Sequence, residues 1–337
     1  MTALTAHPPV LLHPLADRQG APAALLLDVD CTAGDAGAHL PAYLLNPLLP
    51  QLAGGSMGCF YRAAVPQAVA DALAQAGWQA LAADQLQRLD SPTLPAAGAP
   101  WTEGEWFMAA PPSPVGAQVA SRALALHLVQ LVSADADTHE IEAALRQDPT
   151  LSYHLLRLVN SLGMSTGRRV TSFSQAILIL GRSQLRRWLN LMLFSSREGD
   201  RRSPMLLARV AVRARTMELL ARDTGLSKTQ QELAFMVGMF SLLGVLFGMA
   251  LPDVLKPLTI SESVQQALLA HEGELGQLLS LVEAAERDDH QALAPALLAL
   301  QVEPAQFGQI VVEAYLWMQT IAAGKAGKAA KADPRHA

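Results

Sequence analysis

The sequence predicts an α+β protein, in which a small α/β unit at the N-terminus precedes an all-α helical bundle. Strand-like and helix-like patterns alternate before residue 90, and stretch 90–117 is dense in proline and glycine without a helical period. After it, one amphipathic helix pattern follows another. We therefore divide the chain into an α/β region (1–116), an all-α domain (117–323) and a flexible basic tail (324–337).

The composition excludes disordered and fibrous classes. Of the 337 residues, 51% are hydrophobic and 16% are charged, against an ordinary charged fraction of about 25%. Cys31 and Cys59 lack metal-ligand spacing, which favours free thiols in a reducing cytosol. No basic residue precedes Arg18 and no long apolar run opens the chain, so no secretory signal is expected. We predict a cytoplasmic protein.

Three elements are predicted in the first region. The apolar run at 23–30 fits a buried strand, and Met57–Ala63 fits a second strand. A helix is expected over Pro66–Ala76, because proline is favoured at the first helical position. At about 115 residues, this region is too short for a closed eight-stranded barrel.

The helices of the second region are predicted from their caps. Asp137 with Glu140 has capping-box spacing, and the helix is expected to run to Gln147. Further helices are expected over 149–162, 173–180 and from Ser183, and then after Ser203, Ser227 and Ser261. The helix after Ser261 begins a pair that ends near Glu286, and Pro304 opens a last helix to about Ala323.

Residues Leu233–Pro252 form twenty positions without a charge, about the length that crosses a bilayer. Gly238, Gly244 and Gly248 interrupt this run, and amphipathic patterns flank it. A buried core helix is therefore favoured, and no membrane span is predicted.

Motifs of catalysis are missing from the sequence. It has no G-x-S-x-G, no glycine-rich phosphate loop and no H-E-x-x-H, and none of its nine histidines directly precedes an aspartate. The acidic pairs Asp28/Asp30 and Asp288/Asp289 fit solvated or capping roles without a third ligand. We predict no catalytic, metal-binding or cofactor-binding residue, and no enzymatic activity.

Arginine supplies the strongest electrostatic feature. Between Arg157 and Arg222 there are thirteen arginines and three acids, a local balance of +10, whereas residues 1–116 hold three arginines and nine acids, a balance of −6. The guanidinium group suits carboxylates and phosphates. These arginines therefore either pair with acids of the first region or bind an anionic partner such as an acidic protein, a nucleotide or a nucleic acid.

The run EIEAALRQDPTLSYHLLRLVNSLGMSTGRRVTSFSQAILILGRSQLRRWLNLMLF (140–194) closely resembles the HDOD domain of bacterial signalling proteins, in the subgroup with an EAL-type domain in front. The resemblance extends to AFMVGMFSLLG (234–244) and SLVEAAERDD (280–289). It implies a helical bundle related to HD metal-dependent phosphohydrolases, generally without their catalysis. Ser241 and Leu242 take the positions of the metal-binding His-Asp pair, and neither can ligate a metal in that way.

The segments AGWQALAADQLQRLD and GEWFMAAPPSP resemble the last helix, strand and proline segment of an EAL domain. The family's Glu-Ala-Leu tripeptide is missing, and no lysine precedes Lys228. The resemblance therefore implies a truncated, degenerate EAL-like region.

Together these observations predict a non-catalytic regulatory protein that binds unidentified signalling proteins through its HDOD domain. The predicted contact surface consists of five arginines: Arg182, Arg186, Arg187, Arg201 and Arg202. One alternative is a protein that binds nucleic acid or a signalling nucleotide, such as a cyclic dinucleotide, through the arginine-rich stretch 157–222. A third hypothesis is a residual hydrolase, which a metal analysis of the purified protein would test.

Overall fold

The fold is that of a computed structural model. The structure describes residues 9–29, 47–90, 98–109, 136–145, 201–256 and 260–329, together with residues 40, 44, 127, 130, 131, 134, 187 and 258. The predicted helices over 149–162 and 173–180 and the start of the one from Ser183 lie outside these residues.

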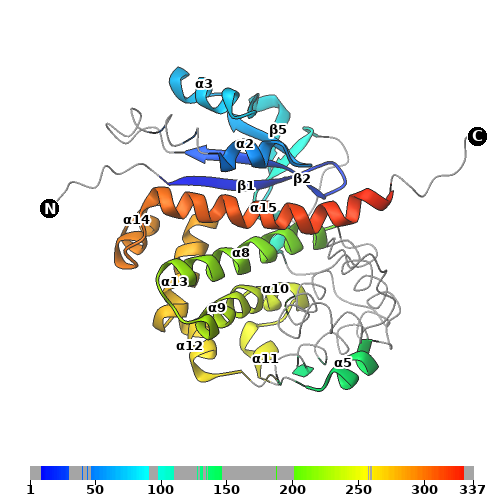
Figure 1. The fold of residues 1–337 in the computed structure, drawn as a ribbon. Helices are drawn as coiled ribbons and strands as arrows, with labels where there is room; N and C mark the ends of the chain where they lie inside the picture. The colour runs from blue at the N-terminus through cyan, green and yellow to red at the C-terminus, as the bar shows by residue number, and fades with distance from the viewer. Residues whose placement is uncertain are drawn as a thin grey trace, which may run out of the picture.

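A six-stranded mixed sheet occupies the N-terminal end of the molecule (Figure 1). Its strand order is β4-β3-β2-β1-β6-β5. Strand β1 is antiparallel to both of its neighbours, whereas β2, β3 and β4 run parallel to one another, as do β5 and β6. The strands are β1 (Val10–Ala16), β2 (Pro22–Val29), β3 (Gly58–Arg62), β4 (Gln79–Leu81), β5 (Leu86–Arg88) and β6 (Trp101–Glu103).

The sheet is curled. Strands β3 and β6 are separated by two other strands, yet their side chains are in contact. The rings of Phe60 and Trp101 lie 5.4 Å apart between centroids. Two residues further along each strand, and therefore on the same face of the sheet, Arg62 Nη2 lies 2.7 Å from Glu103 Oε2. A small apolar core fills this concave face, formed by the buried side chains Leu15, Ala24, Leu26 and Leu81.

Helices make up the remainder of the described structure. Near the sheet lie α2 (Leu48–Ala53), α3 (Gln67–Gln75) and the short 3-10 turns η1 (Ala83–Gln85) and η2 (Trp106–Met108). The helical region comprises α5 (Thr138–Leu145), α8 (Ser203–Asp223), α9 (Lys228–Phe240), α10 (Leu243–Phe247), α11 (Leu251–Leu255), α12 (Glu262–Ala270), α13 (Gly273–Glu286), α14 (His290–Ala299) and α15 (Pro304–Ala329).

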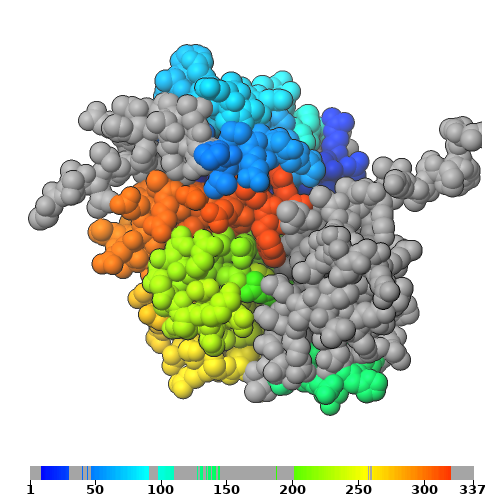
Figure 2. Space-filling view, viewed as in Figure 1, coloured from blue at the N-terminus to red at the C-terminus, as the bar shows by residue number. Residues whose placement is uncertain are grey.

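Helix α15 connects the two regions. It runs between the sheet and α8 in Figure 1, and its residues form a band between the two regions in Figure 2. The Tyr315 hydroxyl donates to the Leu12 carbonyl at 2.9 Å, and the Gln319 amide donates to the Leu52 carbonyl at 3.4 Å. One continuous apolar core extends from β1 and β2 through α15 and α8 to α9 and α13.

Several predicted elements are confirmed. The strands predicted at 23–30 and 57–63 are β2 and β3, and the helix predicted over 66–76 is α3. In the helical region, Ser227 accepts a hydrogen bond from the Gln230 amide at 3.3 Å and Ser261 accepts one from the Val264 amide at 3.4 Å, as N-caps should.

Other elements differ from the prediction. Strand β1 was not predicted, because Pro14 lies inside it and proline is unusual within a strand. The stretch predicted as irregular contains β6 and η2, and α14 was also missed. The last helix continues to Ala329, beyond the predicted end at Ala323 and into the predicted tail.

The long uncharged segment, Leu233–Pro252, spans the end of α9, the whole of α10 and the start of α11. By length and hydropathy alone, Lys228–Phe247 could cross a membrane. However, 56% of its most apolar 18 residues is buried within the fold. Helix α9 ends at Phe240, and α10 begins at Leu243. This packing suggests a soluble protein, in line with the predicted core helix, whereas the cytoplasmic location stays a prediction.

Candidate functional site

Helix α8 carries charged side chains into the centre of the molecule. Arg209, Arg213 and Glu218 are 7%, 4% and 4% exposed. A buried charge is costly unless an opposite charge and hydrogen bonds compensate it. The partners of these three side chains therefore define the most constrained polar region of the described structure.

Arg209 and Arg213 share the carboxylate of Glu286 on α13. Arg209 Nη1 lies 3.1 Å from Glu286 Oε2, and Arg213 forms two further contacts with the same carboxylate, one of them at 3.0 Å. Arg209 also contacts Glu105, next to η2, at 2.8 Å. We call Arg209, Arg213, Glu283, Glu286 and Ser241 the central cluster.

Glu283 continues this cluster toward the surface. It lies 3.2 Å from Arg213 Nη1, 3.1 Å from His271 Nε2 and 3.7 Å from Arg287 Nη1. His271 and Arg287 are 42% and 57% exposed in their side chains, whereas Glu283 is 19% exposed. The buried guanidinium groups are thus linked to solvent through one carboxylate.

The surroundings fix the charge of the cluster. Burial alone would raise the pKa of Glu286, but the charges of Arg213 and Arg209 outweigh it and lower that pKa below its ordinary value. Burial raises the pKa of the neighbouring Tyr315 hydroxyl well above its usual range. Glu286 is therefore ionised and Tyr315 neutral around pH 7.

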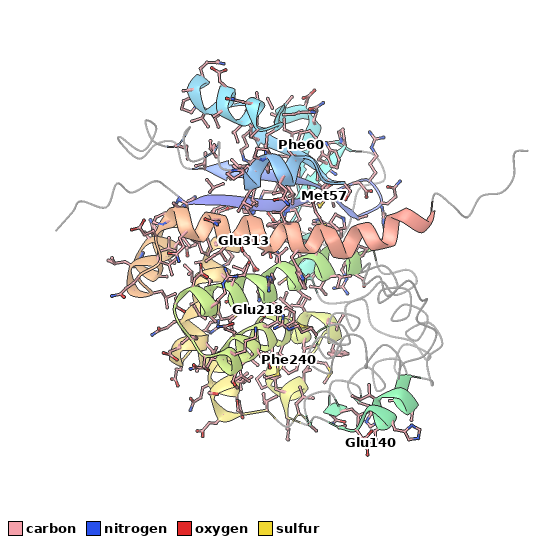
Figure 3. All side chains as sticks on the ribbon, in the orientation of Figure 1. Met57, Phe60, Glu140, Glu218, Phe240 and Glu313 are labelled. Atoms are coloured by element: carbon pink, nitrogen blue, oxygen red, sulfur yellow. The ribbon has the colours of Figure 1, made fainter. Side chains whose placement is uncertain are left out.

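A second group of charges surrounds Glu218, which is labelled in Figure 3. Both of its oxygens contact Arg187, one at 3.0 Å, and Arg215 lies 2.6 Å from Oε2. The guanidinium of Arg187 also lies 4.7 Å from the ring centroid of Phe235, within the range of a cation–π interaction. Arg187 and Glu218 are 13% and 5% exposed in their side chains, so this pair belongs to the interior.

A small pocket adjoins the central cluster between β1, α8, α13 and α15. Its polar lining consists of His13, Arg209, Thr216, Glu286 and Tyr315, and its volume is about 40 Å³. One ordered water needs about 10–15 Å³ by this measure. The pocket therefore has room for a few water molecules and is far too small for a dinucleotide.

Of the two residues predicted at the HD positions, Ser241 belongs to the central cluster and Leu242 follows it. Ser241 follows the last residue of α9; its hydroxyl accepts from Arg213 Nη1 at 2.8 Å and donates to the Gly238 carbonyl at 2.8 Å. Leu242 is 2% exposed. Within the described ranges, no three His, Cys, Asp or Glu side chains form a group that could hold a metal ion. Ser241 and Leu242 offer neither an imidazole nor a carboxylate ligand. Their assignment as vestigial HD positions, and the expectation of no metal site, stay predictions.

The five arginines of the predicted contact surface are in different environments. Arg187 is paired with Glu218, and Arg202 is 5% exposed and donates to the Ala109 carbonyl. Arg201 is exposed and donates to the Arg18 carbonyl at 2.6 Å. Arg182 and Arg186 lie outside the described residues. A contact surface would thus involve Arg201 rather than Arg187 or Arg202, and that surface stays a prediction.

The other interpretation of the arginines, pairing with acids of the first region, has direct support. Arg209 contacts Glu105, while Arg201 and Arg202 bind backbone carbonyls of residues 18 and 109. Arginines just before α8 and within it therefore help to hold the N-terminal region against the helices.

The model of the HDOD domain family matches residues 120–298. The chain belongs to the HDOD family. In this HDOD protein, helix α15 follows the matched residues and joins them to the N-terminal sheet. The degenerate EAL-like assignment of region 1–116, and the division at residue 116, stay predictions.

Two curated relatives match this HDOD chain over about half of its length. One is "Cyclic di-GMP phosphodiesterase CdgJ" of Vibrio cholerae, 33% identical over 188 residues, which are 56% of this chain and 43% of CdgJ. The other is the uncharacterized protein YuxH of Bacillus subtilis, 29% identical over 179 residues, which are 52% of this chain and 43% of YuxH. The match thus spans less than half the length of either relative.

A solved structure from Shewanella amazonensis SB2B is also similar, with a TM-score of 0.42 and 15% identity over 60% of this chain and 92% of that one. A likeness of this extent carries no argument about function.

The similarity to CdgJ corrects the functional prediction. The sequence predicted a non-catalytic regulator that is not an enzyme, whereas a relative with 33% identity bears the name of a phosphodiesterase. The prediction failed because it relied on the missing HD pair and Glu-Ala-Leu tripeptide, and on the general lack of catalysis in the family. Motif loss at one site does not exclude chemistry at other residues.

Sequence reasoning also missed the central cluster. Arg209 and Arg213 are four residues apart on α8, and Glu283 and Glu286 are three apart on α13, so each pair lies on one face of its helix. This spacing does not show that the two faces meet.

Proposed function

We propose that this HDOD protein acts in cyclic di-GMP signalling, in a protein that hydrolyses the cyclic dinucleotide. The observation that carries the proposal is the 33% identity with CdgJ, over 56% of this chain. In this hydrolysis, water adds to phosphorus, the bond to a ribose 3′ oxygen breaks, and that oxygen takes up a proton. The product is a linear dinucleotide.

The described residues limit where the dinucleotide binds. The pocket of about 40 Å³ cannot admit it, and Arg209 and Arg213 are already paired with carboxylates. Arg201 differs, because it is exposed and donates to a backbone carbonyl, which leaves its charge without a carboxylate partner among the described residues. We therefore assign phosphate contact to Arg201, with Arg182 and Arg186 as further candidates in the same arginine-rich stretch.

Binding of cyclic di-GMP to the purified full chain tests this proposal. We expect saturable binding by isothermal titration calorimetry, weakened at least fivefold in Arg201→Gln, since a charge-assisted phosphate contact is worth about 1.5–3 kcal/mol. Lys228→Gln is the matched control and should bind like the wild type, because this exposed residue at the start of α9 lies outside the stretch. No detectable binding by the wild type, or equal affinity of the wild type and Arg201→Gln, would contradict the assignment.

A further inference from the structure

A histidine of the sheet meets an aspartate of the helical region. His13 lies on β1, and Asp288 lies in the turn between α13 and α14. His13 Nε2 is 2.8 Å from Asp288 Oδ1, and their side chains are 15% and 37% exposed. Although Asp288 is partly exposed, the two contacting atoms are themselves shielded from solvent.

The two atoms depend on each other. They are 2.8 Å apart without the geometry of a hydrogen bond, and neither has a hydrogen-bond partner among the described residues, so their electrostatic attraction is the compensation for removing both from water. The backbone at Asp288 has φ +56°, a left-handed conformation that is uncommon for residues other than glycine. The turn thus holds the carboxylate against β1 at a conformational cost.

Charged groups from each neighbouring element face this pair. The charges of His290, at the start of α14, and of Arg88, on β5 of the sheet, both act on Asp288. Arg209, Glu286 and Tyr315 line the adjoining pocket from α8, α13 and α15. Burial would raise the pKa of Asp288, but contact with His13 and the charges of His13, His290 and Arg88 lower it. Asp288 therefore stays ionised at every pH at which a histidine changes its charge.

The charge of the pair is then decided by the imidazole. A histidine ordinarily gains its charge between about pH 8 and pH 5. When the ring is protonated, an ionic contact joins β1 to the α13–α14 turn. When it is neutral, the carboxylate faces an uncharged ring in a shielded position, and the attraction is weaker.

We propose that His13 and Asp288 form a pH-sensitive latch between the N-terminal sheet and the HDOD helices. The latch is closed in mildly acidic solution and weakened above neutral pH. His13 lines the same pocket as Arg209, and Arg209 pairs with Glu105 of the N-terminal region, so the state of the latch acts on the interface that this ion pair also holds.

A double-mutant cycle on the full chain tests the latch. The free energy of unfolding is measured by urea denaturation for the wild type, His13→Gln, Asp288→Asn and the double variant, at pH 5.5 and at pH 8.5. We expect a coupling of about fivefold in the unfolding constant at pH 5.5 and less than twofold at pH 8.5. Equal coupling at both pH values, or none at pH 5.5, would overturn the proposal.

His271 and Glu283 provide the matched control. They also form a histidine–carboxylate contact, at 3.1 Å, but His271 is 42% exposed and both residues belong to the helical region. His271→Asn keeps a residue that tolerates the left-handed backbone at φ 57°. The factor by which this substitution changes the unfolding constant should differ less than twofold between pH 5.5 and pH 8.5.

A second measurement decides the matter if His13→Gln does not fold. The titration of His13 is followed by NMR in the wild type and in Asp288→Asn. Loss of the carboxylate should move the midpoint to lower pH, because the protonated ring loses its partner. An unchanged midpoint would show that Asp288 does not hold the protonated ring.

Discussion

Removal of the Glu286 charge should strongly destabilise the fold, although the substitution hardly changes the size of the side chain. Glu286 is 14% exposed and contacts Arg209 and Arg213, which are 8% and 5% exposed in their side chains. Removing one partner of a buried ion pair typically costs about 3–5 kcal/mol, because a buried charge is left uncompensated. Arg209 keeps Glu105 at 2.8 Å and Arg213 keeps Glu283 at 3.2 Å. We therefore expect Glu286→Gln to cost about 3 kcal/mol, the lower end of that range.

Urea denaturation at pH 7 measures this change, and Glu274→Gln on the same helix is the control. Glu274 is exposed and should cost less than about 0.5 kcal/mol. The folded-state pKa of Glu286 is lowered, so its contribution is present above the pKa of the unfolded chain and is lost as pH falls through the folded-state value. The gap between wild type and Glu286→Gln should therefore close below about pH 4. A loss under 1 kcal/mol at pH 7, or a gap that persists in acid, would refute the reasoning.

Three further predictions concern packing and reactivity. Tyr315→Phe removes the bond that joins α15 to the Leu12 carbonyl and should cost about 1–2 kcal/mol by urea denaturation; an unchanged midpoint would show that this bond does not stabilise the fold. Gly238→Ala would place a methyl group 2.7 Å from the Ala214 backbone, so α8 and α9 must separate at a cost of about 1–3 kcal/mol; the stabilisation usual for Gly→Ala in a helix would contradict this close approach. Burial raises the pKa of the Cys59 thiol to about 12, so in a Cys31→Ser variant a thiol reagent at pH 8 should react only after unfolding; rapid labelling of the native protein would argue against burial.

The fold class could be predicted because its signals are local. Capping serines, prolines at helix starts and apolar periodicity identified α8, α9, α12 and α15 without tertiary information. Strand β1 and helix α14 were not found in this way. Each contains a proline, at positions 14 and 295. Strand β1 also packs against α15 and β6, which lie far away in the sequence. Helix α14 does have a local signal that was missed, because Asp289 caps it by accepting from the Ala292 amide at 3.0 Å.

The candidate site could be predicted only in part. The excess of positive charge in 157–222 and of negative charge in 1–116 indicated that arginines pair with acids of the first region, and Arg209 with Glu105 confirms this for one pair. The sequence did not indicate which carboxylates of the helical region pair with the buried arginines. Glu286 and Glu218 become acceptors because helix packing brings them to α8 and to Arg187, and residue spacing does not encode that packing.

The account is tested most directly by incubating the purified full chain with cyclic di-GMP and measuring the linear dinucleotide by chromatography. We expect product to accumulate in proportion to protein concentration and to decrease in Arg201→Gln, while Lys228→Gln retains the wild-type rate. No product at protein concentrations equal to the substrate, from a chain whose folding is verified by urea denaturation, would contradict the proposed hydrolysis.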